Sequence, residues 1–257
     1  MKIKIIGVTE SKLENVDGRS DTPYQFCAKA MGACVSSNPL ELMATENLDT
    51  TLKRLDRTLK ERHHSGFDMY NIVLEMDDVS KIFCMFLNNL HTFTTEETSG
   101  RHKELVLPPK EKAVFDYFYG KFYNYACEKS PDAPERVKKQ IALENARYTT
   151  GLNAKTNIVH AVTLRHLNYV YNMAKNLLNK ENLNIYEQLV LPDMQNFCDI
   201  LDEMTIENEP IINPILQKDP YGREFNLFGD GKKHAEHFGK TYEIYYQASA
   251  TAAAQLQ

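Results

Sequence analysis

Alternating apolar and polar residues predict two β-strands in the first third of the chain. Lys2 to Val8 alternates along a first strand, and Met69 to Met76 carries its apolar residues on one side of a second. Asp77 and Asp78 follow at once, and acidic residues in this place are suited to capping the next helix. We therefore expect the second strand to end at Asp77 and a helix to follow it directly.

Apolar residues spaced three and four apart predict helices along most of the remaining chain. The longest, about Lys155 to Leu178, has a polar side that includes Arg165 and Asn168. Pro192 is expected to begin another helix, because proline fits the first helical turn. The other expected helices run from Leu48 to about His63, from Val79 to Leu90, from Lys110 to Lys129, and from Pro134 to Arg147 with Val137, Ile141 and Ala142 inward.

The segment from Lys110 to Lys129 is rich in aromatic residues. At helical spacing, aromatic side chains pack in a core more commonly than they form a stacking platform. We therefore expect these side chains to be part of the core. They are Phe115, Tyr117, Phe118, Tyr119, Phe122, Tyr123 and Tyr125.

The apolar pattern weakens after Glu207, where prolines and glycines mark loops before a last amphiphilic piece from His237 to Tyr246. The sequence shows neither an internal repeat nor a convincing linker. We therefore expect a single domain over residues 1–257, with a C-terminal extension from about residue 207.

Composition narrows the classes of function. A net charge of −5 and a pI near 5.9 lack the basic footprint of a duplex DNA or RNA binder, although a local pocket for one small anion stays open. No apolar run approaches the ~20 residues that span a bilayer. The apolar segment at the start of the chain is too short and too interrupted by polar residues for a signal peptide. We expect a cytosolic protein that binds neither nucleic acid nor membranes.

Cysteine and histidine residues give no sign of a metal site. The five cysteines are scattered and contain no Cys-x-x-Cys pair, so buried thiols are favoured over disulfides or zinc ligands. His63 and His64 lack further ligands at the usual spacing, and we expect capping or surface roles for them.

Two short polar stretches within apolar helical sequence carry the candidate chemistry. The first runs from Glu96 to His102 and contains Arg101, and the second runs from Ala146 to Asn153 and contains Arg147. A hydroxyl, a glycine and a guanidinium in sequence can offer a phosphate a side-chain donor, a close backbone N–H and a bidentate fork. The alternative is a surface loop in which Arg101 pairs with Glu96 or Glu97.

The order of these stretches resembles the flavin-dependent thymidylate synthase family. That family runs from a helix into Arg-His-Arg, then seven residues, then Ser-x-Arg-Tyr, and this chain reads Asn89-Leu90-His91 and Ser99-Gly100-Arg101-His102 in the same register. The resemblance extends from about Gln25 to Ala174. Further similar segments are Gly32-Ala33-Cys34-Val35-Ser36, His64-Ser65-Gly66-Phe67-Asp68, Ala146-Arg147, Leu152-Asn153, Thr156, Val162, Arg165 and Leu167.

The resemblance implies an α+β subunit, with helices packed on a small β-sheet, that assembles as a homotetramer. It implies a reaction in which FAD, reduced by NADPH, supports transfer of a methylene from methylenetetrahydrofolate to C5 of dUMP. By position, dUMP would be held by Glu97, Ser99, Gly100, Arg101 and the Arg147 of a neighbouring subunit. By position, the flavin would be held by Ser36, Asp68, His91, Arg165 and Tyr169.

Departures from the family pattern keep two alternatives open. Asn89 and Leu90 stand where the family has arginine and histidine, and Ala174 stands where it has an arginine. The alternatives are a flavoenzyme of the same fold that acts on another pyrimidine nucleotide, and a non-catalytic nucleotide-binding or assembly partner. With fewer basic groups, flavin anchoring would depend on His91 and Arg165, unless Arg165 forms a salt bridge with a surface carboxylate.

Overall fold

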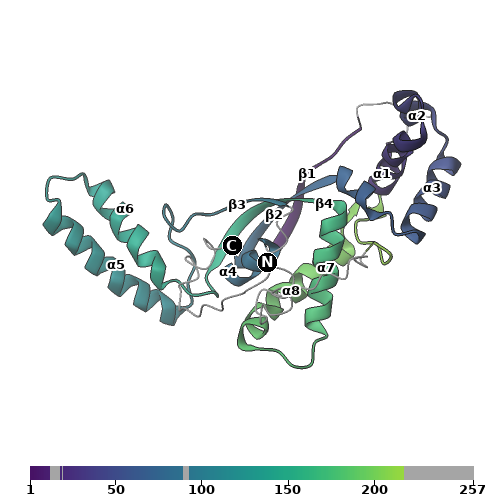
Figure 1. Cartoon of the computed structure of the whole chain (residues 1–257). Coiled ribbons are helices and arrows are strands. Elements are labelled where there is room, and N and C mark those ends of the chain that lie inside the picture. Colours follow the sequence, from purple (N-terminus) through teal and green to yellow (C-terminus); the bar gives the residue numbers. More distant parts are fainter. Residues whose placement is uncertain (12–17, 19, 89–92, 217–257) are drawn as a thin grey trace, which may run out of the picture.

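The computed structural model describes residues 1–11, 18, 20–88 and 93–216. A four-stranded antiparallel sheet lies at the centre of the molecule (Figure 1), and its strand order is β1-β2-β4-β3. This architecture confirms the α+β class. The strands are β1 (Lys2–Val8), β2 (Asn71–Ser80), β3 (Phe93–Glu97) and β4 (Lys155–Thr163), and β5 (Thr205–Ile206) pairs separately with β6 (Glu209–Pro210).

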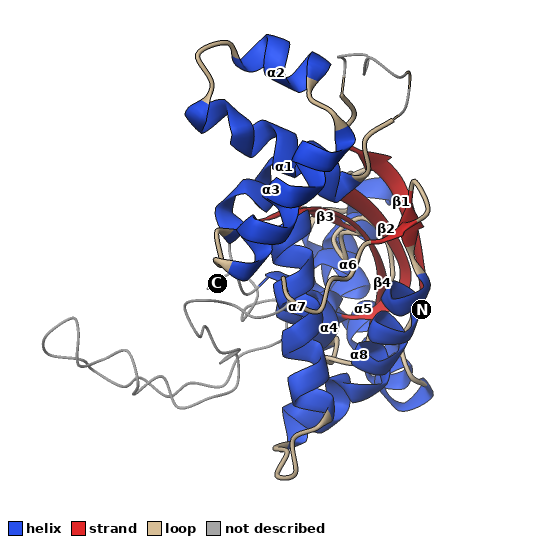
Figure 2. Cartoon of the chain, turned by 90° about the vertical axis from the view of Figure 1, so that its right-hand side faces the viewer, coloured by secondary structure: helices blue, strands red, loops and turns tan. Residues whose placement is uncertain are grey.

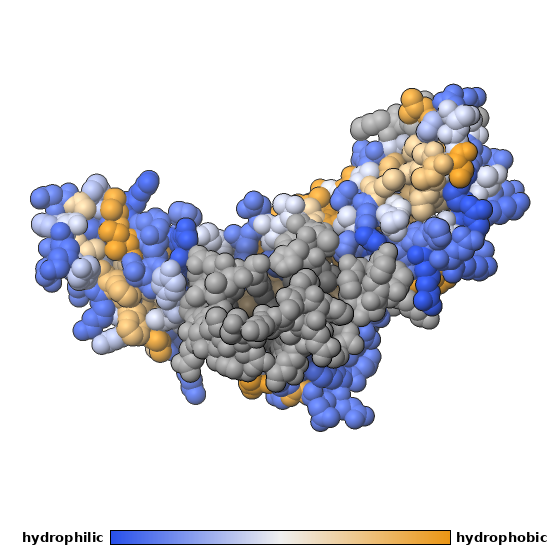
Figure 3. Space-filling model, viewed as in Figure 1, coloured by the Kyte–Doolittle hydropathy of each residue, from blue (hydrophilic) through white to orange (hydrophobic). Residues whose placement is uncertain are grey.

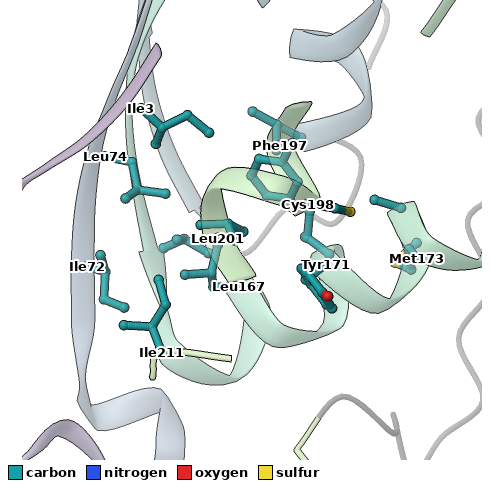
Figure 4. Close-up of a cluster of buried hydrophobic side chains, with 14 of the residues drawn as sticks. Ile3, Ile72, Leu74, Leu167, Tyr171, Met173, Phe197, Cys198, Leu201 and Ile211 are labelled. Atoms are coloured by element: carbon teal, nitrogen blue, oxygen red, sulfur yellow. The ribbon is translucent and has the colours of Figure 1, made fainter. Parts of the chain in front are cut away.

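Three helices cover one face of the sheet, where the hydrophobic core lies. Along β2, Ile72, Leu74 and Met76 are buried in alternation with more exposed residues, as a half-buried strand requires. Figure 4 shows Ile72 and Leu74 beside Leu201 in this core. The helices are α4 (Lys81–Leu87), α7 (Leu164–Leu178) and α8 (Ile185–Glu203).

Further helices extend from the sheet in two directions (Figures 1 and 2). A layer of helices from the N-terminal part of the chain lies on one side and stands above the sheet in Figure 2, and a long helical hairpin lies on the other side in Figure 1. The N-terminal layer contains α1 (Pro23–Gly32), η1 (Ala33–Val35), α2 (Pro39–Thr45), α3 (Leu48–Lys60) and η2 (His64–Met69). The hairpin contains α5 (Pro109–Lys129) and α6 (Glu135–Ala146), followed by η4 (Arg147–Thr149).

The expectation of one continuous helix from Lys155 to Leu178 is wrong. Residues 155–163 form β4, in the interior of the sheet between β2 and β3, and the helix begins only at Leu164. The side chain of Thr163 accepts a hydrogen bond from His166 N at 3.3 Å and so marks the boundary. Asn168, expected on the polar side, is buried because its amide donates to the carbonyls of Leu164 and Ile211.

Two expected helix starts are also displaced. Asp77 and Asp78 lie within β2, where the pairing with β4 shifts, and Ser80 caps α4 by accepting from Phe83 N at 3.2 Å. Pro192 lies inside α8, which begins earlier at a capping box formed by Asn184 and Glu187. In both places a hydroxyl or amide side chain supplies the cap.

The aromatic residues of α5 do not form the expected core. Of the 21 residues of this helix, only Phe115 and Ala126 are buried, while Tyr117 and Tyr125 are 60% and 58% exposed. Apolar side chains are visible along the hairpin surface in Figure 3. Val137 on α6, expected inward, is exposed as well. The two helices pack mainly on each other and extend away from the sheet (Figure 1), so each leaves an uncovered side.

The cysteine expectation holds for three of five residues. Cys27, Cys84 and Cys198 are buried, whereas Cys34 is exposed and Cys127 is partly exposed. None of the helices within the described ranges is long and apolar enough to cross a membrane.

Candidate functional site

The first polar stretch, which the sequence pattern placed within helical sequence, begins as a strand and continues into a tight turn. β3 ends at Glu97, and Thr98 N continues the pairing by donating to Asn157 O at 3.0 Å. In the turn, His102 N and Lys103 N both donate to Ser99 O at 3.1 Å. The edge strand therefore fixes the position from which Gly100 and Arg101 are presented.

The second polar stretch lies against this turn in the same chain. A Cβ atom built on Gly100 would lie 3.9 Å from the Cβ of Arg147, and Gln140 Nε2 donates to Arg101 O at 3.1 Å. Arg147 begins η4 at the C-terminal end of α6. The single chain thus brings together Gly100, Arg101 and Arg147, although the resemblance implied that Arg147 would come from a neighbouring subunit.

The ion pairs around this turn differ from those of the surface-loop alternative, in which Arg101 pairs with Glu96 or Glu97. Glu97 forms an ion pair with Lys81, the first residue of α4, and so does not pair with Arg101. Within the described residues, the exposed Arg101 guanidinium has no carboxylate partner. Arg147 donates to Glu144 O at 3.0 Å and to the Tyr148 hydroxyl at 3.2 Å, and its guanidinium likewise lacks a carboxylate partner in this part of the chain. We name Ser99 to Arg101 together with Arg147 the arginine turn.

A second polar cluster joins η2 to the start of α7 around Asp68. Arg165 Nε donates to Asp68 Oδ1 at 2.8 Å, and its Nη2 donates to Oδ2, so the pair is bidentate. Thr163 Oγ1 donates to Asp68 Oδ1 at 2.8 Å, and His166 Nδ1 lies 3.4 Å from the same oxygen. Burial tends to raise the pKa of Asp68, but the hydrogen bonds from His166, Thr163 and Arg165 outweigh it and lower that pKa. Arg165 therefore forms the salt bridge with a partly exposed carboxylate that we considered as the alternative to flavin binding.

Behind this pair lie Tyr169 and two histidines. The Tyr169 side chain is only 2% exposed, its hydroxyl lies 3.1 Å from His64 Nδ1, and the Arg165 guanidinium lies 5.8 Å from the centre of its ring. His64 is buried, so the surface or capping role expected for it is wrong, whereas His63 is exposed. His166 is buried as well, and its Nε2 has no hydrogen-bond partner within the described residues.

The remaining predicted flavin residues lie apart or outside the described chain. Ser36 follows η1, where its Oγ accepts from Asn38 N at 3.1 Å beside a hollow of about 350 Å³ lined by α2. His91 lies outside the described residues. The structure therefore groups Asp68, Arg165 and Tyr169, and it shows no contact that joins Ser36 to them.

Sequence reasoning missed three residues of these clusters. Lys81 was overlooked because it begins helix α4 while its partner Glu97 ends strand β3, and only the fold brings the two together. Thr163 and His166 were placed inside a helix, although threonine is a preferred N-cap residue. The described residues contain no group of three His, Cys, Asp or Glu side chains arranged to hold a metal ion.

Asp68→Asn should lower the free energy of unfolding at pH 7 by about 1–2 kcal/mol, a modest loss because the carboxylate is 31% exposed and partly screened. Since the pKa of Asp68 is lowered in the folded state, its contribution is present above the unfolded pKa of about 3.9 and disappears as pH falls through the folded value. Denaturant titrations from pH 7 to pH 3 should show the difference from wild type shrinking.

Asp56→Asn is the matched control, because Asp56 forms an exposed ion pair with Lys60 on one helix. It should change stability little at any pH. A difference between Asp68→Asn and wild type that stays constant down to pH 3 would contradict the assigned role of the carboxylate.

Comparison with known proteins gives one family and several structures. The sequence model of the family described as thymidylate synthase complementing protein matches residues 18–194. No curated protein matches the sequence. Among solved structures, the flavin dependent thymidylate synthase ThyX from Helicobacter pylori, complexed with FAD and dUMP, is 15% identical, covering 83% of this chain and 98% of that chain, with a TM-score of 0.47. The UMP/dUMP methylase PolB from Streptomyces cacaoi, bound with 5-Br dUMP, is 9% identical, covering 84% and 92%, with a TM-score of 0.50. At such identity the likeness to PolB concerns the fold alone.

Proposed function

This chain belongs to the thymidylate synthase complementing protein family, and from that premise we propose that it acts as a flavin-dependent thymidylate synthase. The reaction is the transfer of a methylene group from methylenetetrahydrofolate to C5 of dUMP, with FAD as the cofactor and NADPH as the reductant. The arginine turn is the proposed site of the dUMP phosphate. We further propose that the protein works in the cytoplasm.

The observation that carries this proposal is the pair of guanidiniums without carboxylate partners. Surface arginines are commonly paired with nearby acids, and here Glu97 is held by Lys81 and Glu104 is held by Lys112. Arg101 therefore keeps its forked N–H groups available for a doubly charged phosphate, and Arg147 keeps those that do not donate to Glu144 O and the Tyr148 hydroxyl. Ser99 and the backbone at Gly100 add a hydroxyl and a close approach for the same anion.

The Asp68 cluster fits the polar atoms of a flavin in part. Arg165 uses two of its N–H groups on Asp68 and retains others, and the two side chains are 15% and 31% exposed. Asp68 and Arg165 would therefore hold FAD with a donor and an acceptor at the surface, whereas Tyr169 at 2% exposure offers no direct contact in this conformation. When bound, FAD would supply the electrons for the transfer.

A second candidate function is a non-catalytic nucleotide-binding or assembly partner. Three features favour it: Asp68 is already hydrogen-bonded within the chain, Tyr169 is buried, and Asn89 and Leu90 replace two basic family residues. A flavoenzyme that acts on another pyrimidine nucleotide shares the same phosphate site. These candidates differ in whether the protein binds flavin and in which base it accepts.

The proposal includes a homotetramer, supported by the uncovered side of the α5–α6 hairpin. A two-helix hairpin with few buried residues is marginal in water unless something covers it. Between the helices lies a hollow of about 350 Å³ lined in part by Phe122, Tyr125 and Ile141. A second copy of this chain would bury these apolar side chains, as closed homo-oligomers commonly do.

Flavin titration tests the enzyme against the non-catalytic partner. The purified protein should show a flavin absorption band at about 450 nm, and it should quench the fluorescence of added FAD. Arg165→Ala and His91→Ala should each weaken FAD binding about fivefold or more, because a charged donor is lost. Arg57→Ala, an exposed arginine on α3, is the matched control and should bind FAD as wild type does.

Two outcomes decide against parts of this assignment. A colourless wild-type protein that ignores added FAD would favour the non-catalytic partner. Tight FAD binding that survives both substitutions would place the flavin on other residues.

A further inference from the structure

Glu97 is held at the start of the arginine turn by the first residue of α4. Lys81 Nζ donates to Glu97 Oε1 and forms an ion pair with it. The Lys81 and Glu97 side chains are only 22% and 25% exposed. This position makes Glu97 a partly desolvated carboxylate that requires a charged or hydrogen-bonding partner.

Arg101 is the alternative partner for this carboxylate. It follows Glu97 by only four residues across the turn that begins at Ser99, and both side chains are long. A carboxylate and a guanidinium form a bidentate pair readily. Such a pair would occupy the donors that the proposed function assigns to phosphate, and it would place a negative charge beside the incoming anion.

We propose that Lys81 is a positioning residue that keeps the arginine turn open to the nucleotide phosphate by holding Glu97 away from Arg101. This inference rests on the proposed function, and it assigns to Lys81 a role exerted through Glu97. It explains why Arg101 is unpaired although acidic residues precede it in sequence. The binding specificity of the turn for anions thus depends on a cation that does not belong to the turn.

Cys84 supports the same arrangement. Burial, followed by the nearby Glu97 charge, raises the pKa of the Cys84 thiol well above its usual range. The thiol therefore stays protonated at neutral pH and adds no second negative charge beside Glu97.

A double-mutant cycle read out by dUMP affinity tests the proposal. With Glu97 in place, Lys81→Met should weaken dUMP binding about tenfold, because the released carboxylate turns to Arg101. In the Glu97→Gln background, the same Lys81→Met change should cost less than about threefold, because no carboxylate remains to capture Arg101. Comparing within each background cancels any contact that Glu97 itself makes with the nucleotide.

Lys81→Arg and Lys60→Met are the matched variants. Arginine at position 81 keeps the ion pair and should retain wild-type affinity. Lys60 forms an exposed ion pair with Asp56 on α3, away from the arginine turn, so Lys60→Met should also bind dUMP as the wild type does. If Lys81→Met unfolds, Lys81→Gln gives the same comparison with a polar, uncharged side chain. Isothermal calorimetry and thermal melts should be recorded for every variant.

The outcomes separate this inference from the proposed function. Absence of dUMP binding by the wild type would overturn the function. Wild-type binding that Lys81→Met leaves unchanged would overturn only the role of Lys81. An equal loss in both backgrounds would also overturn it, because Lys81 would then touch the phosphate or support the fold of the turn.

Discussion

Arg101→Ala and Arg147→Ala should each weaken dUMP binding by about 1–3 kcal/mol, which is about 5- to 150-fold in the dissociation constant. Each change removes a charge-assisted donor from a site in which no described carboxylate competes for the guanidinium. The loss should be largest at low ionic strength, because both side chains are at least partly exposed and salt screens them. Isothermal calorimetry with dUMP at two salt concentrations measures both effects.

Arg136→Ala is the matched control, since Arg136 is an exposed arginine at the start of α6, outside the arginine turn. It should bind dUMP as the wild type does. Unchanged affinity in both turn variants would refute the phosphate site.

Mixing the two turn variants addresses where each arginine acts. Because Gly100 and Arg147 are neighbours within one chain, each site should take both arginines from the same chain, and the mixture should stay weak. Restored dUMP binding in mixed oligomers would instead support the composite site implied by the family resemblance.

The sequence predicted helices more reliably than strands, and the reason is visible in β3 and β4. In β4 the apolar residues alternate, but α7 begins at the next residue without a glycine or proline between them, so one helical pattern seemed to cover both. β3 carries threonines and glutamates at the edge of the sheet, where pairing with β4 and not apolar burial holds it. In both cases the feature that makes the segment a strand is its pairing with another strand, which lies elsewhere in the sequence.

The candidate site was predictable where neighbours in sequence stay neighbours in space. Ser99, Gly100 and Arg101 share one turn, and their identities alone suggested an anion. The roles of Lys81 and Asp68 depend on partners far along the chain, Glu97 on β3 and Arg165 on α7, which the sheet and the helix layer bring together. Charge pairing across elements therefore decides which arginine is free, and sequence spacing carries no record of it.

The aromatic residues of α5 failed as a core prediction because helical spacing shows that residues share a face without showing what covers it. Substitutions of Phe197 and Tyr125 can measure the difference between a buried aromatic residue of the core and an exposed one on α5. Phe197 is fully buried and packs edge to face on Phe83, with ring centres 5.4 Å apart. Phe197→Ala should lower the free energy of unfolding by about 3–5 kcal/mol, because it leaves a cavity in the core.

Tyr125→Ala should behave differently, because 58% of the Tyr125 residue is exposed in the single chain. If a second copy covers the hairpin, the loss of stability caused by Tyr125→Ala must depend on protein concentration. The loss caused by Phe197→Ala must not. Light scattering should give a tetramer for the wild type at micromolar concentration and a lower mass for Tyr125→Ala, with thermal midpoints that fall on dilution. A wild-type monomer, or a Tyr125→Ala midpoint equal to that of wild type at every concentration, would show that the hairpin is an exposed surface and that the tetramer does not form through it.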